Sequence, residues 1–220
     1  CGPGSWRRHR QGEDMHPNPV FRKTGAARSL EFARERGFGI LAVSGTGAPL
    51  LSHVPFLLSA DGASAELHLV RSSPICRAVG DGVAARIAVS GPDGYISPDW
   101  YGDPGQVPTW NYVAVHLTGV LRALPHVEME GMLARQSAQF EERLPKPAWT
   151  MDKMDPEAKA RMLRMILPFR FEIEEVDSTW KLNQNKEQAA RLGAAGEVRG
   201  GIGSELGALA ELMRAPPDMT

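Results

Sequence analysis

Between residues 38 and 121 the sequence is a series of short apolar runs, each followed by glycine, proline, aspartate or serine. Runs of about five to ten residues between such turn-forming clusters are typical of strands joined by short turns, not of βαβ units. The runs are Phe38–Val43, Leu50–Leu58, Glu66–Val70, Val83–Val89 and Tyr112–Leu121, and the half-buried pattern Phe169–Val176 comes later. We expect the fourth run to end at the turn-like cluster Gly91–Gly94. The pattern predicts a mainly β fold, an antiparallel barrel or sandwich.

Helical patterns flank these strands. A helix around Leu30 is expected to end at Gly37, because glycine is common directly after a helix. Residues 126–166 carry two helical segments, His126–Phe140 and Asp155–Ile166, and the second begins with Asp155 as cap and a proline in its first turn. One glycine-weakened C-terminal helix, or two, is predicted over 186–214. We expect residues 15–214 to form a single domain.

Residues 1–14 differ from the rest of the chain. Gly2–Ser5 resembles a cleavage scar and Met15 a natural start, so we predict a vector-derived or disordered extension. A native basic arm is the alternative. Two cysteines allow neither a disulfide framework nor a zinc site, and no apolar run approaches the roughly 18 residues of a membrane span. We expect a reduced, cytoplasmic protein with no metal.

The net charge of −1 excludes a strongly basic nucleic-acid-binding surface. A local basic face stays possible, and its candidate residues are Arg161 and Arg164 on the second predicted helix, with Lys153 and Lys159 near them. No helix-turn-helix is recognisable. DNA is therefore a partner that the sequence permits but does not support.

Three segments could bind a ligand. Five of the fifteen aromatic residues fall between Gly94 and Tyr112, among serine, threonine and asparagine, which suits a flat heterocycle. A loop packed on the barrel by its own tryptophans would look the same.

The second segment, His68–Pro74, brings Arg71, Ser72 and Ser73 to the end of a strand, where a guanidinium and hydroxyls suit a phosphate. Its alternative is a surface arginine followed by serines that cap a helix.

The third segment is Trp180–Asn185, which crowds lysine, asparagine and glutamine at a strand end and could equally be a solvated turn. His53 lies alone in an apolar strand, with no arrangement of a catalytic triad or metal site around it.

Together these segments resemble the FMN-binding negative transcriptional regulators, the PaiB-like family. Met15–Phe21 resembles the opening of that family, and His53–Phe56 resembles its His-x-Pro-Phe strand. His68–Pro74 resembles its His-x-Ala-Arg-Ala-Asn-Pro segment. Gly94–Tyr101 and Val107–Tyr112 are similar almost letter for letter to its two long motifs, and Lys181–Asn185 is similar to its Lys-Leu-Ser-Gln-Asn.

The resemblance implies a six-stranded split β-barrel that binds FMN in a groove at a homodimer interface. The phosphate would lie by Arg71, Ser72 and Ser73 after His68, with help from Lys181. The flavin ring would lie against the backbone of His53, Val54 and Pro55, closed by Trp110 and Asn111. Gln184 and Asn185 would meet the ring edge or the ribityl chain.

Fold and cofactor do not settle activity. The favoured hypothesis is an FMN-binding regulator. The alternatives are a small flavin-dependent reductase or oxidoreductase, and a flavin-sensing dimer without turnover.

Overall fold

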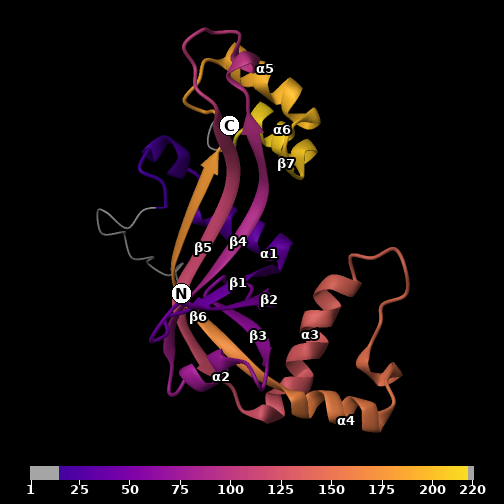
Figure 1. Ribbon diagram of the computed structural model, residues 1–220. Coiled ribbons are helices and arrows are strands. Elements are labelled where there is room, and N and C mark those ends of the chain that lie inside the picture. Colours follow the sequence, from indigo (N-terminus) through magenta and orange to yellow (C-terminus); the bar gives the residue numbers. More distant parts are fainter. Residues whose placement is uncertain (1–14, 218–220) are drawn as a thin grey trace. The chain divides into compact units, whose positions relative to one another are not determined.

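The computed structural model describes residues 15–217 and groups them into two compact units (Figure 1). Within the described residues, unit 1 contains Phe32–Ala88 and Leu117–Glu175. Unit 2 contains 15–31, Val89–His116 and 176–217. Three long strands contribute residues to both units, and each unit is described by itself. The predicted extension 1–14 lies outside the described residues.

Unit 1 holds a closed six-stranded barrel, as predicted. Three strands lie wholly in it: β1 (Phe38–Val43), β2 (Leu50–Leu58) and β3 (Ser64–Val70). The other three are the unit 1 portions of β4 (Val83–Ile96), β5 (Thr109–Ala123) and β6 (Ile166–Lys181). The strand order is β1-β2-β3-β6-β5-β4, and antiparallel pairing of β1 with β4 closes the barrel. The predicted strand positions are confirmed, although β3, β4, β5 and β6 are longer than expected.

The barrel core follows from alternation along these strands. In β3 the residues Ala65, Leu67 and Leu69 are buried between more exposed neighbours. Leu67 is paired with the buried Phe169 of β6. Fully burying an aliphatic or aromatic side chain stabilises the fold by roughly 1.5–3 kcal/mol, so this interior holds the barrel together.

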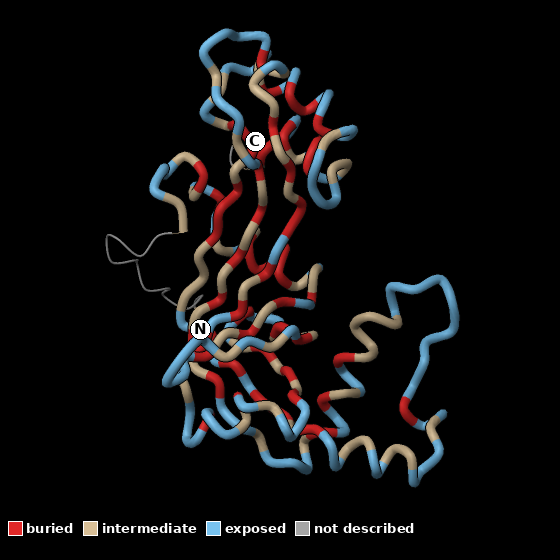
Figure 2. The backbone as a smooth tube through the Cα atoms, in the orientation of Figure 1, coloured by how far each residue is buried: buried red, intermediate tan, exposed pale blue. Residues whose placement is uncertain are grey.

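Four helices and two 3-10 turns accompany the barrel strands. The helix α1 (Ala26–Arg36) ends where Gly37 adopts a left-handed φ of 57°, as predicted. Residues 26–31 of α1 belong to unit 2. Wholly in unit 1 are α2 (Pro74–Ala78), η3 (His126–Glu128), α3 (Met129–Glu141), η4 (Met151–Lys153) and α4 (Pro156–Met165). The predicted cap of α4 is confirmed, since the Asp155 carboxylate accepts from the Ala158 N–H at 2.9 Å. No residue of α4 is buried, which Figure 2 shows along that helix.

Unit 2 combines the remaining parts of β4, β5 and β6 with short helices and one short strand. The helices are η1 (Pro19–Arg22), η2 (Pro98–Tyr101), α5 (Gln188–Glu197), η5 (Val198–Gly200) and α6 (Leu206–Arg214), and the strand is β7 (Gly203–Ser204). Residues 186–214 form two helices, α5 and α6, with η5 and β7 between them, which is one of the two arrangements expected. Gly203 explains the break: its φ is 147°, and a Cβ there would lie 2.2 Å from the Asp93 carbonyl oxygen. The buried Arg191 ties the two helices together by donating to the carbonyls of Met213 and Arg214.

The expectation that β4 ends at Gly91–Gly94 was wrong. The strand continues to Ile96, and Asp93 and Gly94 pair with Ser204 and Gly203 of β7. A Cβ at Gly94 would lie 2.8 Å from a methyl carbon of Leu209 in α6. The glycine therefore permits close packing of a helix on the strand, a role that is indistinguishable from a turn in the sequence alone.

Gly119 offers a test of the barrel geometry. A Cβ there would lie 1.9 Å from the carbonyl oxygen of Glu172, so Gly119→Ala must displace strand backbone. We expect a loss of at least about 3 kcal/mol in the free energy of unfolding, the upper end of the usual cost of overpacking. Urea unfolding measures it.

Gly131→Ala is the matched control, because Gly131 lies within α3 and a Cβ there would have only a flexible arginine tip nearby, at 3.4 Å. That variant should be about 0.5–1 kcal/mol more stable than the wild type, since alanine favours a helix. Equal stability of the two variants would contradict the close approach of β5 to β6.

Candidate functional site

The predicted phosphate segment begins where β3 ends in unit 1. The backbone N–H of Arg71 donates to the Met165 carbonyl at 2.8 Å, and its Nε donates to the Arg164 carbonyl at 3.0 Å. Both acceptors belong to the last residues of α4, so Arg71 satisfies carbonyls that a helix end leaves open. The Nε bond orients the exposed guanidinium, and its two Nη groups have no hydrogen-bond partner among residues 15–217. They can receive an anion in a bidentate way.

The two serines after Arg71 differ in role. The Ser73 Oγ accepts from the Ile75 N–H at 3.3 Å and caps α2, the structural alternative considered from the sequence. Ser72 is exposed beside Arg71 and free to contact a ligand. Cys76 Sγ, one turn later, contacts the Val70 carbonyl, and burial raises the pKa of its thiol, so it is not a reactive thiolate.

His53, Val54 and Pro55 lie on β2, next to β3. Val54 is buried in the barrel, whereas His53 is exposed and stacks on Phe38 of β1 with ring centroids 6.4 Å apart. Pro55 precedes Phe56 and His68 follows Leu67, so in this antiparallel pairing both lie on the same side of the registered pair Phe56↔Leu67. The fold therefore brings these two predicted segments to the same region of unit 1.

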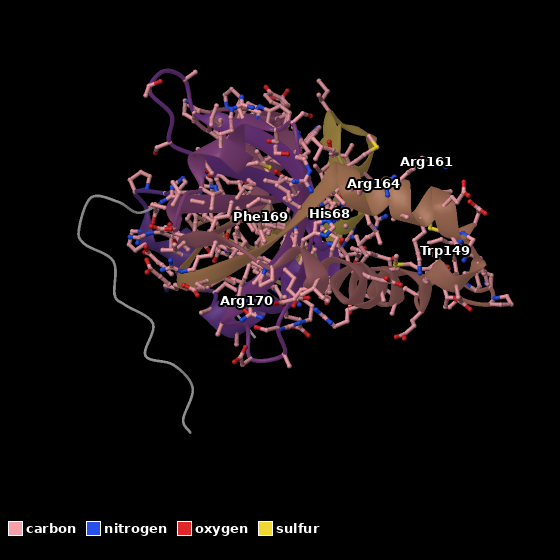
Figure 3. The ribbon with its side chains drawn as sticks, turned by 90° about the horizontal axis from the view of Figure 1, so that it is seen from below. His68, Trp149, Arg161, Arg164, Phe169 and Arg170 are labelled. Carbon is pink, nitrogen blue, oxygen red and sulfur yellow. The ribbon has the colours of Figure 1, made fainter. Side chains whose placement is uncertain are left out.

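His68 is held by the helical segment of unit 1 (Figure 3). The buried Gln136 of α3 lies close to its side chain, and the His68 Nδ1 is buried with no partner among the described residues. Burial lowers the pKa of His68, and the influence of Gln136 opposes this only in part. The neutral form of the imidazole is therefore favoured. In that form His68 can serve packing as well as ligand binding.

The remaining predicted residues lie in unit 2. Trp110 is 45% exposed at the start of β5 and meets Tyr95 edge to face at 6.4 Å. Its neighbour Asn111 is fully buried, and neither atom of its amide has a partner among the described residues. Burying an amide without partners costs about 1–3 kcal/mol, so Asn111 is suited to a ligand or a bound water.

Part of the aromatic segment packs inside unit 2, where the alternative from the sequence had placed it on the barrel. Tyr101 is buried, and a Cβ at Gly201 would lie 3.2 Å from the Trp100 ring. Trp100 thus packs beside η5 within unit 2. Of the tryptophans in the segment, Trp110 is the one left exposed to meet a ligand.

Lys181 and Asn185 line a pocket of about 220 Å³ in unit 2. Its walls are completed by His16, Phe21, Tyr101, Val107, Thr109, Asn183 and Lys186. Gln184, between them in sequence, turns away: its Nε2 donates to the Trp180 carbonyl at 2.6 Å and its Oε1 accepts from the Leu182 N–H at 2.7 Å. Its predicted contact with a flavin stays a prediction.

The pocket has a cationic lining. The Lys181 ammonium donates to Thr109 Oγ1, and the Lys186 ammonium donates to Gln106 Oε1. Burial, together with the charge of Lys186, lowers the pKa of Lys181. Burial and the charge of Lys181 also lower the pKa of His16, whose Nδ1 accepts from the Asn18 N–H at 3.0 Å.

Sequence reasoning missed four residues that the structure brings to this pocket: His16, Tyr101, Asn183 and Lys186. A signal existed for all four, because His16, Tyr101 and Asn183 belong to the motifs Met15–Phe21, Gly94–Tyr101 and Lys181–Asn185, and Lys186 directly follows the last of them. Nothing local indicated that Asn183 adopts a left-handed φ of 65° and lines the pocket. Arg164, whose carbonyl orients Arg71, was considered only as a DNA contact.

No helix in residues 15–217 is long and apolar enough to cross a membrane. In the same range, no group of three or more His, Cys, Asp or Glu side chains could hold a metal ion.

Comparison with known proteins gives three findings. A family model described as "Putative FMN-binding domain" matches residues 15–175. The chain is 28% identical over 202 residues to the protease synthase and sporulation protein PAI 2 of Bacillus subtilis (strain 168), covering 90% of this chain and 96% of that protein. It also resembles the FAD and heme binding protein of Mycobacterium smegmatis, with a TM-score of 0.51, 18% identity and 72% of both chains covered.

A second solved structure, a conserved hypothetical protein of Mycobacterium tuberculosis, gives a TM-score of 0.50 at 12% identity. The match covers 76% of this chain and 92% of that one. At such identities the two structures bear on the fold, and they confirm the split-barrel prediction.

The state of His68 predicts a pH dependence of stability. Because burial lowers its pKa in the folded protein, the unfolded chain binds a proton first as the pH falls below the ordinary value of 6.5. The free energy of unfolding should therefore decrease below about pH 6.5. His68→Gln should show a smaller decrease in urea unfolding between about pH 8 and pH 5.

His16 has the same direction of shift, so part of the dependence should remain in that variant. An unchanged profile in His68→Gln would show that the imidazole is protonated freely in the fold.

Proposed function

The chain belongs to the family of FMN-binding domains, and on that premise we propose that Arg71, with Ser72 beside it, binds the FMN phosphate. One observation carries the assignment: the Nε bond to the Arg164 carbonyl orients the guanidinium and leaves both Nη groups available. A planar fork of donors matches a phosphate, and charge-assisted bonds of this kind are among the stronger ones in proteins. Ser73 contributes by capping α2 rather than by a free hydroxyl.

The ring contacts fit a flavin by their chemistry. Asn111 presents a buried amide with a free donor and a free acceptor, which a heterocycle edge can satisfy. Trp110 offers an exposed aromatic face for stacking and for exclusion of water. We keep His53, Val54, Pro55, His68, Gln184 and Asn185 as further candidate contacts. Bound FMN supplies redox chemistry, and these residues bind and orient it.

We further propose that the protein is a homodimer formed through the outer face of β1 and β2 in unit 1. Phe38 is 53% exposed and Leu51 is 62% exposed, and the exposed His53 stacks on Phe38. Exposed apolar side chains gathered on one sheet face mark an interaction surface. A second copy would bury the same face on both partners, as two-fold interfaces do.

A regulatory role is the favoured biological function, with flavin-dependent reduction and flavin sensing as alternatives. The Bacillus subtilis relative is named for protease synthesis and sporulation. In this chain two cations of the α4 region pair within unit 1: Lys159 pairs with Glu130 at 2.7 Å and Arg161 lies 3.7 Å from Glu157. We therefore propose regulation through flavin binding rather than through a DNA-reading helix.

The phosphate assignment predicts a preference for FMN over riboflavin. Arg71→Ala should weaken FMN binding about ten- to hundredfold, since it removes a charge-assisted pair worth about 1.5–3 kcal/mol, and should leave riboflavin binding unchanged. Quenching of flavin fluorescence measures both affinities. NADH or NADPH added to the loaded protein then tests the reductase alternative.

Arg77→Ala is the matched control, because Arg77 is also an exposed arginine near this loop, on α2. It should bind FMN like the wild type. Equal wild-type affinities for FMN and riboflavin would refute the phosphate site, whatever the variants do.

The dimer proposal predicts that Leu51→Glu is monomeric. A carboxylate at this exposed position costs the isolated chain little, but it would be buried without a partner in the interface. Light scattering should show the wild type at twice the chain mass and Leu51→Glu at the mass of one chain. Val127→Glu, at a position 88% exposed on η3, should remain dimeric. A monomeric wild type with bound flavin would contradict the proposal.

A further inference from the structure

The polar side chains that line the pocket of unit 2 are mainly hydrogen-bond donors. Lysine ammonium groups carry three donors each, so Lys181 and Lys186 keep donors free after bonding Thr109 and Gln106. Because the Nδ1 of His16 is an acceptor, its neutral ring carries the proton on Nε2. No carboxylate is among the lining residues. Two carboxylates, Asp103 and Glu187, line a second pocket that shares Lys186, and Asp103 accepts there from Gln106 at 2.6 Å.

A buried asparagine supplies a second, independent indication of a ligand. Asn183 lines the pocket and is 2% exposed, and its Nδ2 has no hydrogen-bond partner among the described residues. Its Oδ1 is used, since it accepts from the Tyr101 hydroxyl at 3.4 Å. A buried N–H donor without an acceptor destabilises the fold. The backbone of Asn183 is also left-handed, a conformation that asparagine tolerates.

The charges of the pocket are not balanced from within. Neither Lys181 nor Lys186 forms an ion pair with a carboxylate in residues 15–217, and the two ammonium groups disfavour each other. Each ammonium lies over an aromatic ring, which carries no net charge. The Lys181 ammonium is 5.9 Å from the centre of the Phe21 ring, and that of Lys186 is 5.1 Å from the centre of the Tyr101 ring. A bound anion would supply the missing charge.

We propose that this pocket binds a compact oxyanion, the phosphate or carboxylate group of a small molecule other than FMN, held by Lys181, Lys186 and Asn183. The volume of about 220 Å³ is below the roughly 300 Å³ at which pockets for drug-sized ligands begin. It therefore suits a small molecule or the charged end of a larger one. The inference goes beyond the proposed function, which places the FMN phosphate at Arg71, and it gives Lys181 a ligand other than the one the sequence suggested.

Amide NMR of the full chain tests the site with inorganic phosphate as the probe. Titration at constant ionic strength should shift the amides of Asn183, Asn185 and Lys186 in a saturable way, in the FMN-free protein and equally after saturation with FMN. Chloride should produce no such shifts. A parallel titration with acetate compares the carboxylate group, and tighter binding of either anion identifies the preferred head group.

Lys186→Gln should weaken phosphate binding at least about tenfold, because it removes one of two cationic ligands, and should leave FMN absorbance and affinity unchanged. Lys23→Gln makes the same charge change at an exposed position of unit 2 outside the pocket and should bind phosphate like the wild type. Asn183→Asp, which replaces the unpaired donor by a carboxylate, should abolish binding. Circular dichroism verifies that each variant is folded.

Two outcomes would overturn the inference. Shifts that do not saturate, or that chloride reproduces, would show non-specific screening only. Shifts that FMN abolishes and riboflavin does not would show that the pocket holds the FMN phosphate itself. Saturable phosphate binding in a protein that binds no FMN would support the inference while refuting the proposed function, so the two can fail separately.

Discussion

The pairing of β3 with β6 is the constraint on which the rest of unit 1 depends. It joins segments about a hundred residues apart, from Ser64↔Glu172 to Val70↔Ile166. Without it the barrel cannot close, because β6 carries the order from β3 to β5 and β4, and β4 returns to β1. The pairing also delivers the end of β3 to the end of α4, where the carbonyls of Arg164 and Met165 receive Arg71.

The consequence is that one arginine has both a structural and a binding role. Arg71 satisfies the terminal carbonyls of α4 through its backbone and Nε, and this bonding orients the Nη groups outward. An arginine held in this way loses less conformational entropy on meeting a phosphate than a free one would. Lysine could not serve both purposes, since it has no fork of fixed donors.

Unit 2 solves a different electrostatic problem. Its two pocket lysines are partly buried near each other, and burial and mutual repulsion lower the pKa of Lys181. Hydrogen bonds to Thr109 and Gln106 orient the ammonium groups but do not neutralise them. Asn183, buried with an unpaired donor, adds to the same imbalance. Such features are costly in a fold and are therefore informative about function.

The sequence by itself determined the strands, the helix caps and the motifs that identify the family, because alternation, capping and turn chemistry are local. Asp155 caps α4, and Arg71 follows a strand, as their neighbours in sequence predict. Tertiary structure alone decided that Gly94 packs under α6 instead of turning the chain, and that Gln184 bonds its own backbone while Asn183 and Lys186 face a pocket with His16. These outcomes depend on contacts between residues far apart in the chain, and no local pattern encodes which distant residue fills the space beside a glycine or an amide.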